Sequence, residues 1–129
     1  MNKLISTNKP ILCFDLDNTI CTTKKNFYKF SKPKKKIIEM INELFMEGYY
    51  IKIFTARYMG RSNENISKAK KSGYELTKKQ LNKWSLKHHE LIFGKPSYDI
   101  LVDDKSFGFK KNWHKNFKYY LKNDFKNHK

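Results

Sequence analysis

The feature that most constrains the fold is a set of short apolar runs that each end in a polar cluster. These runs are residues 11–14, 50–54 and 98–102, and the polar residues that follow them are Asp15, Thr55 and Asp103. Runs of this length and composition are typical of strands in a parallel sheet. The carboxyl ends of parallel strands meet at one edge, where α/β proteins bind their ligands. We therefore expect the three polar clusters to lie in one site.

The segments between these runs have helical periodicity. Helices are expected at about residues 33–47, 64–71, 77–86 and 112–123, with a further short strand at residues 90–93. Gly73 is expected to end the second helix, and Thr77 is expected to cap the third. Strands that alternate with helices predict an α/β fold, here a Rossmann-like parallel sheet sandwiched by helices.

The 129 residues are expected to form a single domain, residues 1–129, with its core at about residues 11–122. Cys13 lies inside an apolar run, which is typical of a buried thiol, and its spacing from Cys21 fits no metal site. No apolar stretch is long enough to cross a membrane, so we expect no membrane partner. Residues 1–10 lack the apolar run of a secretion signal, so a cytoplasmic protein is expected.

The chain has a net charge of +16, from 28 basic and 12 acidic residues. Such a charge is typical of nucleic-acid binding. However, only Arg57 and Arg61 are arginines, whereas sites that bind nucleic acid or grip phosphate with two hydrogen bonds usually favour arginine. We favour a lysine-rich composition over a nucleic-acid surface, and both interpretations stay open. Either way, the positive field attracts anionic substrates.

The segment Asp15-Leu16-Asp17-Asn18-Thr19 follows the first apolar run and places two carboxylates two residues apart. The period of an extended chain can direct both side chains to the same side. Neighbouring carboxylates repel each other unless a cation neutralises them, and a hard divalent cation suits oxygen ligands. One carboxylate can then act as a nucleophile while the other transfers protons. The less favoured alternative is a pair of solvated acids at a strand end.

Four further residues suit the binding of a phosphoryl group. The Thr55 hydroxyl and the backbone N–H that follows it, on Ala56, can donate hydrogen bonds to a phosphoryl oxygen. Arg57 fits either a pairing with substrate phosphate or a surface salt bridge, and the sequence leaves both open. Lys95 lies in a Gly-Lys-Pro turn, from which its ammonium can stabilise charge on a transferring phosphoryl group.

Asp103 and Asp104 directly follow the last apolar run. Acids at this position match the metal-binding edge of a parallel sheet. The alternative is that they satisfy the free N–H groups of a helix N-terminus.

The order and spacing of these four clusters resemble the haloacid dehalogenase-like (HAD) superfamily of phosphohydrolases. Residues 15–19 look like its first motif, Thr55 like its second, Lys95 like its third, and residues 103–104 like its fourth. The resemblance covers about residues 11–109. Two segments, residues 55–61 and residues 94–105, are also similar to a group of short phosphatases associated with capsule and surface-polysaccharide biosynthesis in bacteria.

The resemblance implies a magnesium-dependent phosphatase. Asp15 would attack phosphorus and form an aspartyl-phosphate, and Asp17 would protonate the leaving alcohol and then activate water. The implied ligands of Mg²⁺ are the side chains of Asp15 and Asp103 and the backbone carbonyl of Asp17, while Asp104 positions Lys95 or a metal-bound water. The implied contacts with the phosphoryl group or the substrate are Leu16, Thr55, Ala56, Arg57 and Lys95.

The gaps from residue 19 to residue 33 and from residue 57 to residue 77 are too short for the cap domain of larger members. The resemblance therefore implies a capless enzyme with an open site. The leading substrate is a sugar phosphate of a surface-glycan pathway. The alternatives are a phosphatase of nucleic-acid ends and a non-catalytic phosphate-binding module of the same fold. The sequence does not define the oligomeric state.

Overall fold

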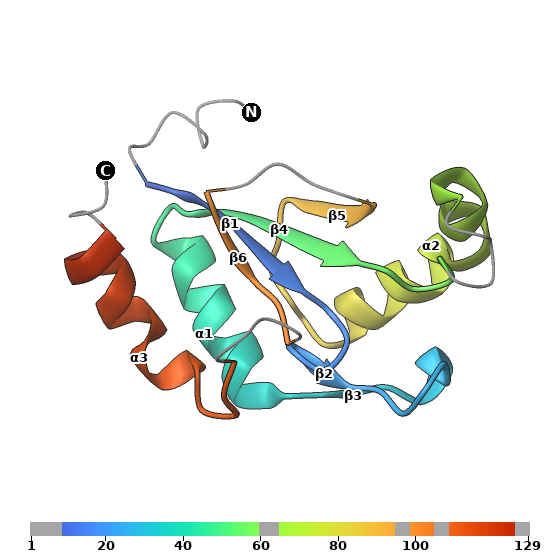
Figure 1. Cartoon of the computed structure of the whole chain (residues 1–129), viewed down its shortest axis with the longest axis horizontal. Helices are drawn as coiled ribbons and strands as arrows, with labels where there is room; N and C mark the ends of the chain where they lie inside the picture. Colours follow the sequence, from blue (N-terminus) through green and yellow to red (C-terminus); the bar gives the residue numbers. More distant parts are fainter. Residues whose placement is uncertain (1–8, 60–64, 95–98, 105–108, 126–129) are drawn as a thin grey trace.

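The computed structural model describes residues 9–59, 65–94, 99–104 and 109–125. Its centre is a parallel sheet of four strands: β1 (Ile11–Asp15), β4 (Tyr50–Thr55), β5 (Glu90–Phe93) and β6 (Ile100–Val102). The strand order is β5-β4-β1-β6, as Figure 1 shows. The predicted α/β fold with a Rossmann-like parallel sheet is confirmed, but the described helices lie on one face of the sheet and do not sandwich it as expected.

Three α-helices of the described residues accompany the sheet: α1 (Lys35–Met46), α2 (Ile66–Lys83) and α3 (His114–Tyr119), the last of which continues into a π-helical turn at Tyr120–Asp124. Between β1 and α1, the chain forms a small antiparallel ribbon of β2 (Cys21–Thr22) and β3 (Lys32–Pro33). We call its connection, residues 23–31, the β2–β3 loop. No helix in the described ranges is long and apolar enough to cross a membrane.

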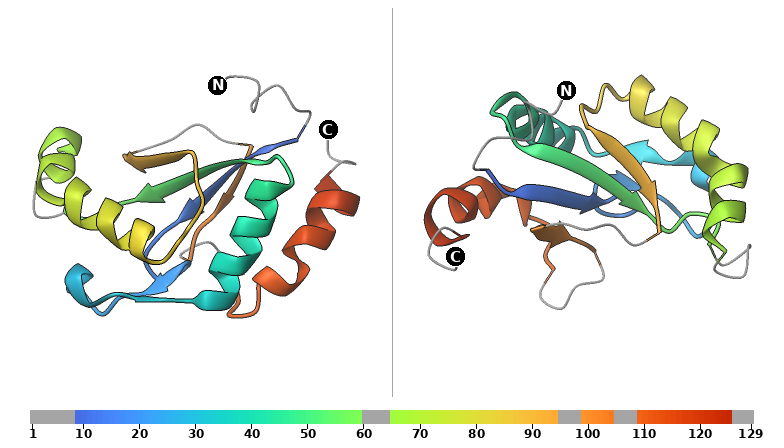
Figure 2. Two further views of the ribbon diagram at one scale, coloured as in Figure 1. Left: turned by 180° about the vertical axis from the view of Figure 1, so that it is seen from behind. Right: turned by 90° about the horizontal axis from the view of Figure 1, so that it is seen from above.

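The helices pack on one face of the sheet (Figure 2). Leu12 pairs in register with Ile51, and Phe14 pairs with Ile53, so all four side chains point to this face, where they are completely buried. The Phe14 ring lies 5.7 Å from the ring of Phe117, which places α3 over β1. Burial of these large apolar side chains is the main stabilising contribution to the domain.

Ion pairs and aromatic contacts join the helices to one another and to this face. Lys118 of α3 reaches Glu43 of α1 at 3.2 Å and Glu47, which directly follows α1, at 2.8 Å, so the two helices lie side by side. Tyr74 of α2 contacts Phe93, whose side chain points to the same face as Ile53. The predicted packing of the C-terminal helix on the sheet is confirmed by the ring contact between Phe117 and Phe14.

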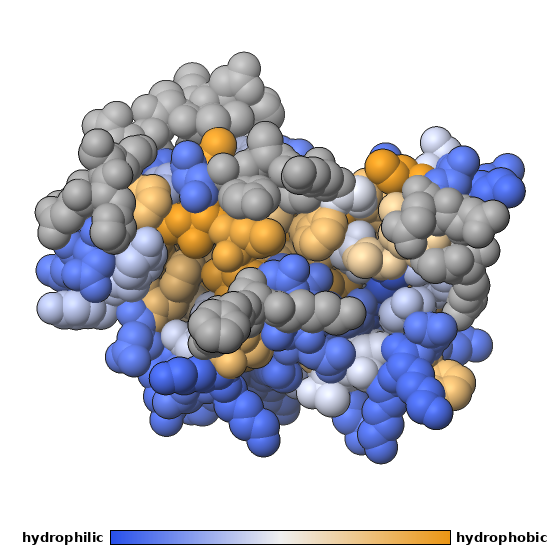
Figure 3. All heavy atoms as spheres, in the orientation of Figure 1, coloured by the Kyte–Doolittle hydropathy of each residue, from blue (hydrophilic) through white to orange (hydrophobic). Residues whose placement is uncertain are grey.

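The opposite face of the sheet carries a different set of side chains. Alternation along the strands places Cys13, Phe54, Ile92 and Leu101 there, and no described helix covers them. Figure 3, which has the orientation of Figure 1, shows apolar residues gathered over the strands. Asp15 lies two residues after Cys13 on β1, so its side chain points to the same face of the sheet as that of Cys13. The carboxylate at the end of β1 therefore points away from the helix-covered face.

The prediction of two separate helices between residues 64 and 86 is wrong, because α2 runs unbroken through Gly73 and Thr77. The Asn65 side chain caps its start by accepting the backbone N–H of Lys68. Gly73 does not end the helix. It makes room for the Tyr58 ring, since a Cβ at position 73 would lie 2.1 Å from Tyr58 Cε2.

We expect Gly73→Ala to destabilise the protein by about 1–3 kcal/mol, the usual cost of overpacking, although alanine favours helix. Thermal unfolding should show a midpoint several degrees lower than that of the wild type. Ser72→Ala, at the exposed neighbouring position, is the matched control and should leave the midpoint unchanged or slightly higher. Equal behaviour of the two variants would contradict the close contact between Tyr58 and Gly73.

Candidate functional site

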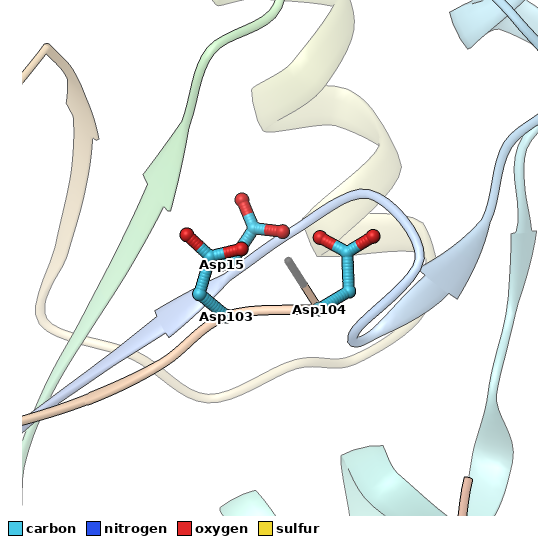
Figure 4. Close-up of side chains that lie close together, drawn as sticks. All are labelled: Asp15, Asp103 and Asp104. Atoms are coloured by element: carbon cyan, nitrogen blue, oxygen red, sulfur yellow. The ribbon is translucent and has the colours of Figure 1, made fainter. Parts of the chain in front are cut away.

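Three carboxylates converge where two neighbouring strands end. Asp15 is the last residue of β1, and Asp103 and Asp104 directly follow β6, which pairs with β1. Each side chain offers an oxygen within 4.8 Å of the others, and all three are half-buried (Figure 4). The expectation that polar clusters after different strands meet at one sheet edge is confirmed for this pair of strands.

The carboxylate of Asp15 sits in an unfavourable electrostatic environment. Its pKa is raised from 3.8 to about 8, most of all by burial, then by a hydrogen bond with Asp104 and by the charges of Asp103, Asp104 and Asp17. A cation among these oxygens would favour the ionised form. Because the donors are all carboxylate oxygens, the cluster fits a hard divalent cation such as Mg²⁺ better than a soft one.

Asp17 is not part of this cluster. Its carboxylate instead receives Arg57, with Nη2 at 2.9 Å from Oδ1 and Nε at 3.0 Å from Oδ2. The Thr23 hydroxyl donates to the same Oδ1, at 2.5 Å. The two acids of the first motif therefore have different partners. The contribution of the Asp17 backbone carbonyl to a metal site stays a prediction.

A cavity of about 390 Å³ lies over these groups. The carboxylates of Asp15, Asp17, Asp103 and Asp104 form part of its lining, together with Asn18, Phe54, Ala56 and Arg57. The β2–β3 loop adds Lys25, Asn26 and Tyr28 on another side. Sequence reasoning missed these three loop residues, because only the folded ribbon brings them over the carboxylates. The one indication of their role in the sequence was that the loop closely follows the first motif.

Arg57 forms a salt bridge that is buried, whereas one of the two alternatives left open by the sequence was a salt bridge at the surface. The residue is only 1% exposed, so the ion pair with Asp17 is largely withdrawn from water. Its remaining guanidinium nitrogen, Nη1, donates to Thr77 and Gln80 of α2. Since protein groups occupy both ends of the guanidinium, this arrangement does not support the alternative of direct pairing with substrate phosphate.

The other predicted contacts divide into three groups. Ala56 lines the cavity, as expected. Thr55 is completely buried, its Oγ1 accepts the backbone N–H of Arg57 at 3.0 Å, and it is not among the residues that line the cavity. The backbone N–H of Leu16 donates to Phe54 O, so it is not free for a substrate. Lys95 lies outside the described residues, and its role stays a prediction.

Comparison with known proteins supports the fold but names no family. No family model matches the chain, and no curated protein matches it. Among solved structures, a Vibrio cholerae protein is similar over 92% of this chain and 99% of its own length, with 22% identity and a TM-score of 0.64. Two chains from structures of a Pnkp1/Rnl/Hen1 complex, one described as an RNA repair complex, are similar at 16% and 13% identity, both with a TM-score of 0.51. This chain spans only 36% and 33% of their lengths.

We predict that Mg²⁺ stabilises the chain more as the pH rises. The folded pKa of Asp15, about 8, lies above its unfolded value of 3.8, so folded metal-free protein retains a proton that the unfolded chain has lost. The stability of the metal-free protein therefore falls as the pH rises from about 4 to about 8. A bound cation needs the ionised carboxylate, so the stabilisation that it provides grows over the same pH range.

The measurement is thermal unfolding with and without millimolar Mg²⁺ at about pH 5 and about pH 9. The gain in midpoint should be larger at the higher pH, and Asp15→Asn should lose most of that difference. An equal gain at both pH values, or none at either, would count against a cation at these carboxylates.

Proposed function

We propose that the chain is a cytoplasmic, magnesium-dependent phosphomonoester hydrolase of the HAD type that acts through an aspartyl-phosphate on Asp15. The observation that carries this proposal is the cluster of Asp15, Asp103 and Asp104 at the sheet edge, with Asp17 nearby but paired to Arg57. A nucleophile, a set of cation ligands and a separate proton-transfer group are the parts that this reaction needs.

In the first step, a carboxylate oxygen of Asp15 attacks phosphorus, and the bond from phosphorus to the leaving oxygen breaks. Asp17 donates a proton to that oxygen as it leaves. In the second step, water attacks phosphorus and gives a proton back to Asp17. Inorganic phosphate leaves, and the Asp15 carboxylate is restored. Both side chains line the same cavity, which gives them access to one substrate.

Asp15 and Asp103 are the residues that would hold Mg²⁺, and Asp104 lies close enough to add a further oxygen. When bound, the ion reduces the repulsion between an anionic nucleophile and an anionic ester. Asp17 lies outside this group and has its own cationic partner, Arg57.

The leading substrate class is a sugar phosphate of a surface-glycan pathway. A cavity of about 390 Å³ is of the size that suits a small molecule. The Lys25 ammonium and the Asn26 amide can hydrogen-bond to sugar hydroxyls, and the Tyr28 ring offers an apolar surface for a sugar ring.

A second candidate is a phosphatase of nucleic-acid ends. The net charge of +16 favours it, as does the likeness of fold to chains from an RNA repair complex. The third interpretation, a non-catalytic phosphate-binding module, is less favoured, because both acids of the first motif and the acids after β6 are present and face one cavity.

The test compares kcat/KM for a panel of sugar phosphates with that for a 3′-phosphorylated oligonucleotide, at physiological salt and with Mg²⁺. We expect the sugar phosphates to be the better substrates and Asp15→Asn to abolish turnover of every ester, since an amide cannot form the acyl-phosphate. A clear preference for the oligonucleotide would replace the substrate class. Near wild-type turnover by a folded Asp15→Asn variant would contradict the mechanism.

A further inference from the structure

Arg57 connects Asp17 to helix α2 through one buried guanidinium. One end, made of Nε and Nη2, holds both carboxylate oxygens of Asp17. At the other end, Nη1 donates to Thr77 Oγ1 at 3.2 Å and to Gln80 Oε1 at 2.5 Å. Both α2 residues are buried, and the Thr77 side chain is completely so. Neither residue belongs to the lining of the cavity.

This arrangement fixes the plane of the guanidinium. An arginine head group is flat and presents its five N–H donors in a rigid fork, so holding Nη1 also sets the direction of Nε and Nη2. The Tyr28 ring lies 4.9 Å from the Arg57 head group and limits its movement from one side. The orientation of Asp17 is therefore set from α2, although no residue of α2 touches Asp17 in the described contacts.

Gln80 has a second contact that points to the same site. Its Nε2 donates to the backbone carbonyl of Tyr28 at 2.6 Å, and Tyr28 belongs to the β2–β3 loop that lines the cavity. In addition, Ser31 Oγ accepts from Arg57 Nη2 at 3.1 Å. One amide side chain thus contacts both the partner of Asp17 and the loop that lines the cavity.

We propose that Thr77 and Gln80 are positioning residues that, through Arg57, hold the Asp17 carboxylate where it transfers a proton to the leaving oxygen. The proposal rests on the proposed function, in which Asp17 is the acid. Without either anchor, the guanidinium loses a fixed acceptor and can turn, and the carboxylate turns with it. Proton transfer is sensitive to such a change, because it requires hydrogen-bond distance to the reacting oxygen.

The experiment compares turnover of two esters by each variant: a simple alkyl phosphate, whose leaving alkoxide needs a proton, and p-nitrophenyl phosphate, whose leaving group needs little protonation. In Thr77→Val and Gln80→Leu, kcat for the alkyl ester should fall on the order of tenfold more than kcat for the nitrophenyl ester. Thr77→Ser keeps the hydroxyl and should restore the wild-type ratio. Lys79→Ala, at an exposed position of the same helix, is the matched control.

The ratio separates positioning from stability, because a smaller folded fraction lowers both rates equally. Equal losses for the two esters in Thr77→Val and Gln80→Leu, or a changed ratio in Lys79→Ala, would overturn the proposal. Asp17→Asn gives the reference: it should slow the alkyl ester far more than the nitrophenyl ester. If Asp17→Asn shows no such selectivity, or if the wild type hydrolyses neither ester, the proposed function itself fails, which is a different result from an unchanged ratio in the α2 variants.

Discussion

The crowding of carboxylates at the ends of β1 and β6 is the constraint on which the rest of the site depends. Parallel pairing of these strands brings Asp15 beside Asp103 and Asp104, and the pKa of Asp15 is raised to about 8, most of all by burial. The sheet is stabilised by apolar packing on its other face, so the cluster need not contribute to folding. Such a cluster is unfavourable without a cation, and this is why it fits a metal site better than a structural one.

The two acids of the first motif face this constraint in different ways. Asp15 remains among other carboxylates, whereas Asp17 receives a permanent cation from Arg57. A buried ion pair is costly to break, because loss of one partner leaves the other charge without compensation in a low-dielectric environment. Within one cavity, the protein therefore separates a carboxylate that lies among other carboxylates from one that a buried arginine holds in place. Helix α2 contacts Arg57 at the second position, and the acids after β6 surround the first.

The sequence predicted the elements that depend on local pattern. The strands at residues 11–15, 50–55 and 90–93 follow from apolar runs, and the meeting of Asp15 with Asp103 follows from the rule that parallel strands end at one edge. The failures depend on tertiary contacts. Gly73 resembled a helix end because its need for space beside Tyr58 is invisible in the sequence. The burial of Arg57 likewise depends on α2 and the β2–β3 loop closing around it.

The central claim is that Asp15 carries the phosphoryl group during turnover. It is tested most directly by quenching the reaction in acid during turnover, reducing the protein with borohydride and mapping its peptides by mass spectrometry. An aspartyl-phosphate is reduced to homoserine, whereas a free carboxylate is not. The account predicts homoserine at position 15 only when substrate and Mg²⁺ are both present. Release of inorganic phosphate with no modification at position 15, or with the modification at another residue, would contradict it.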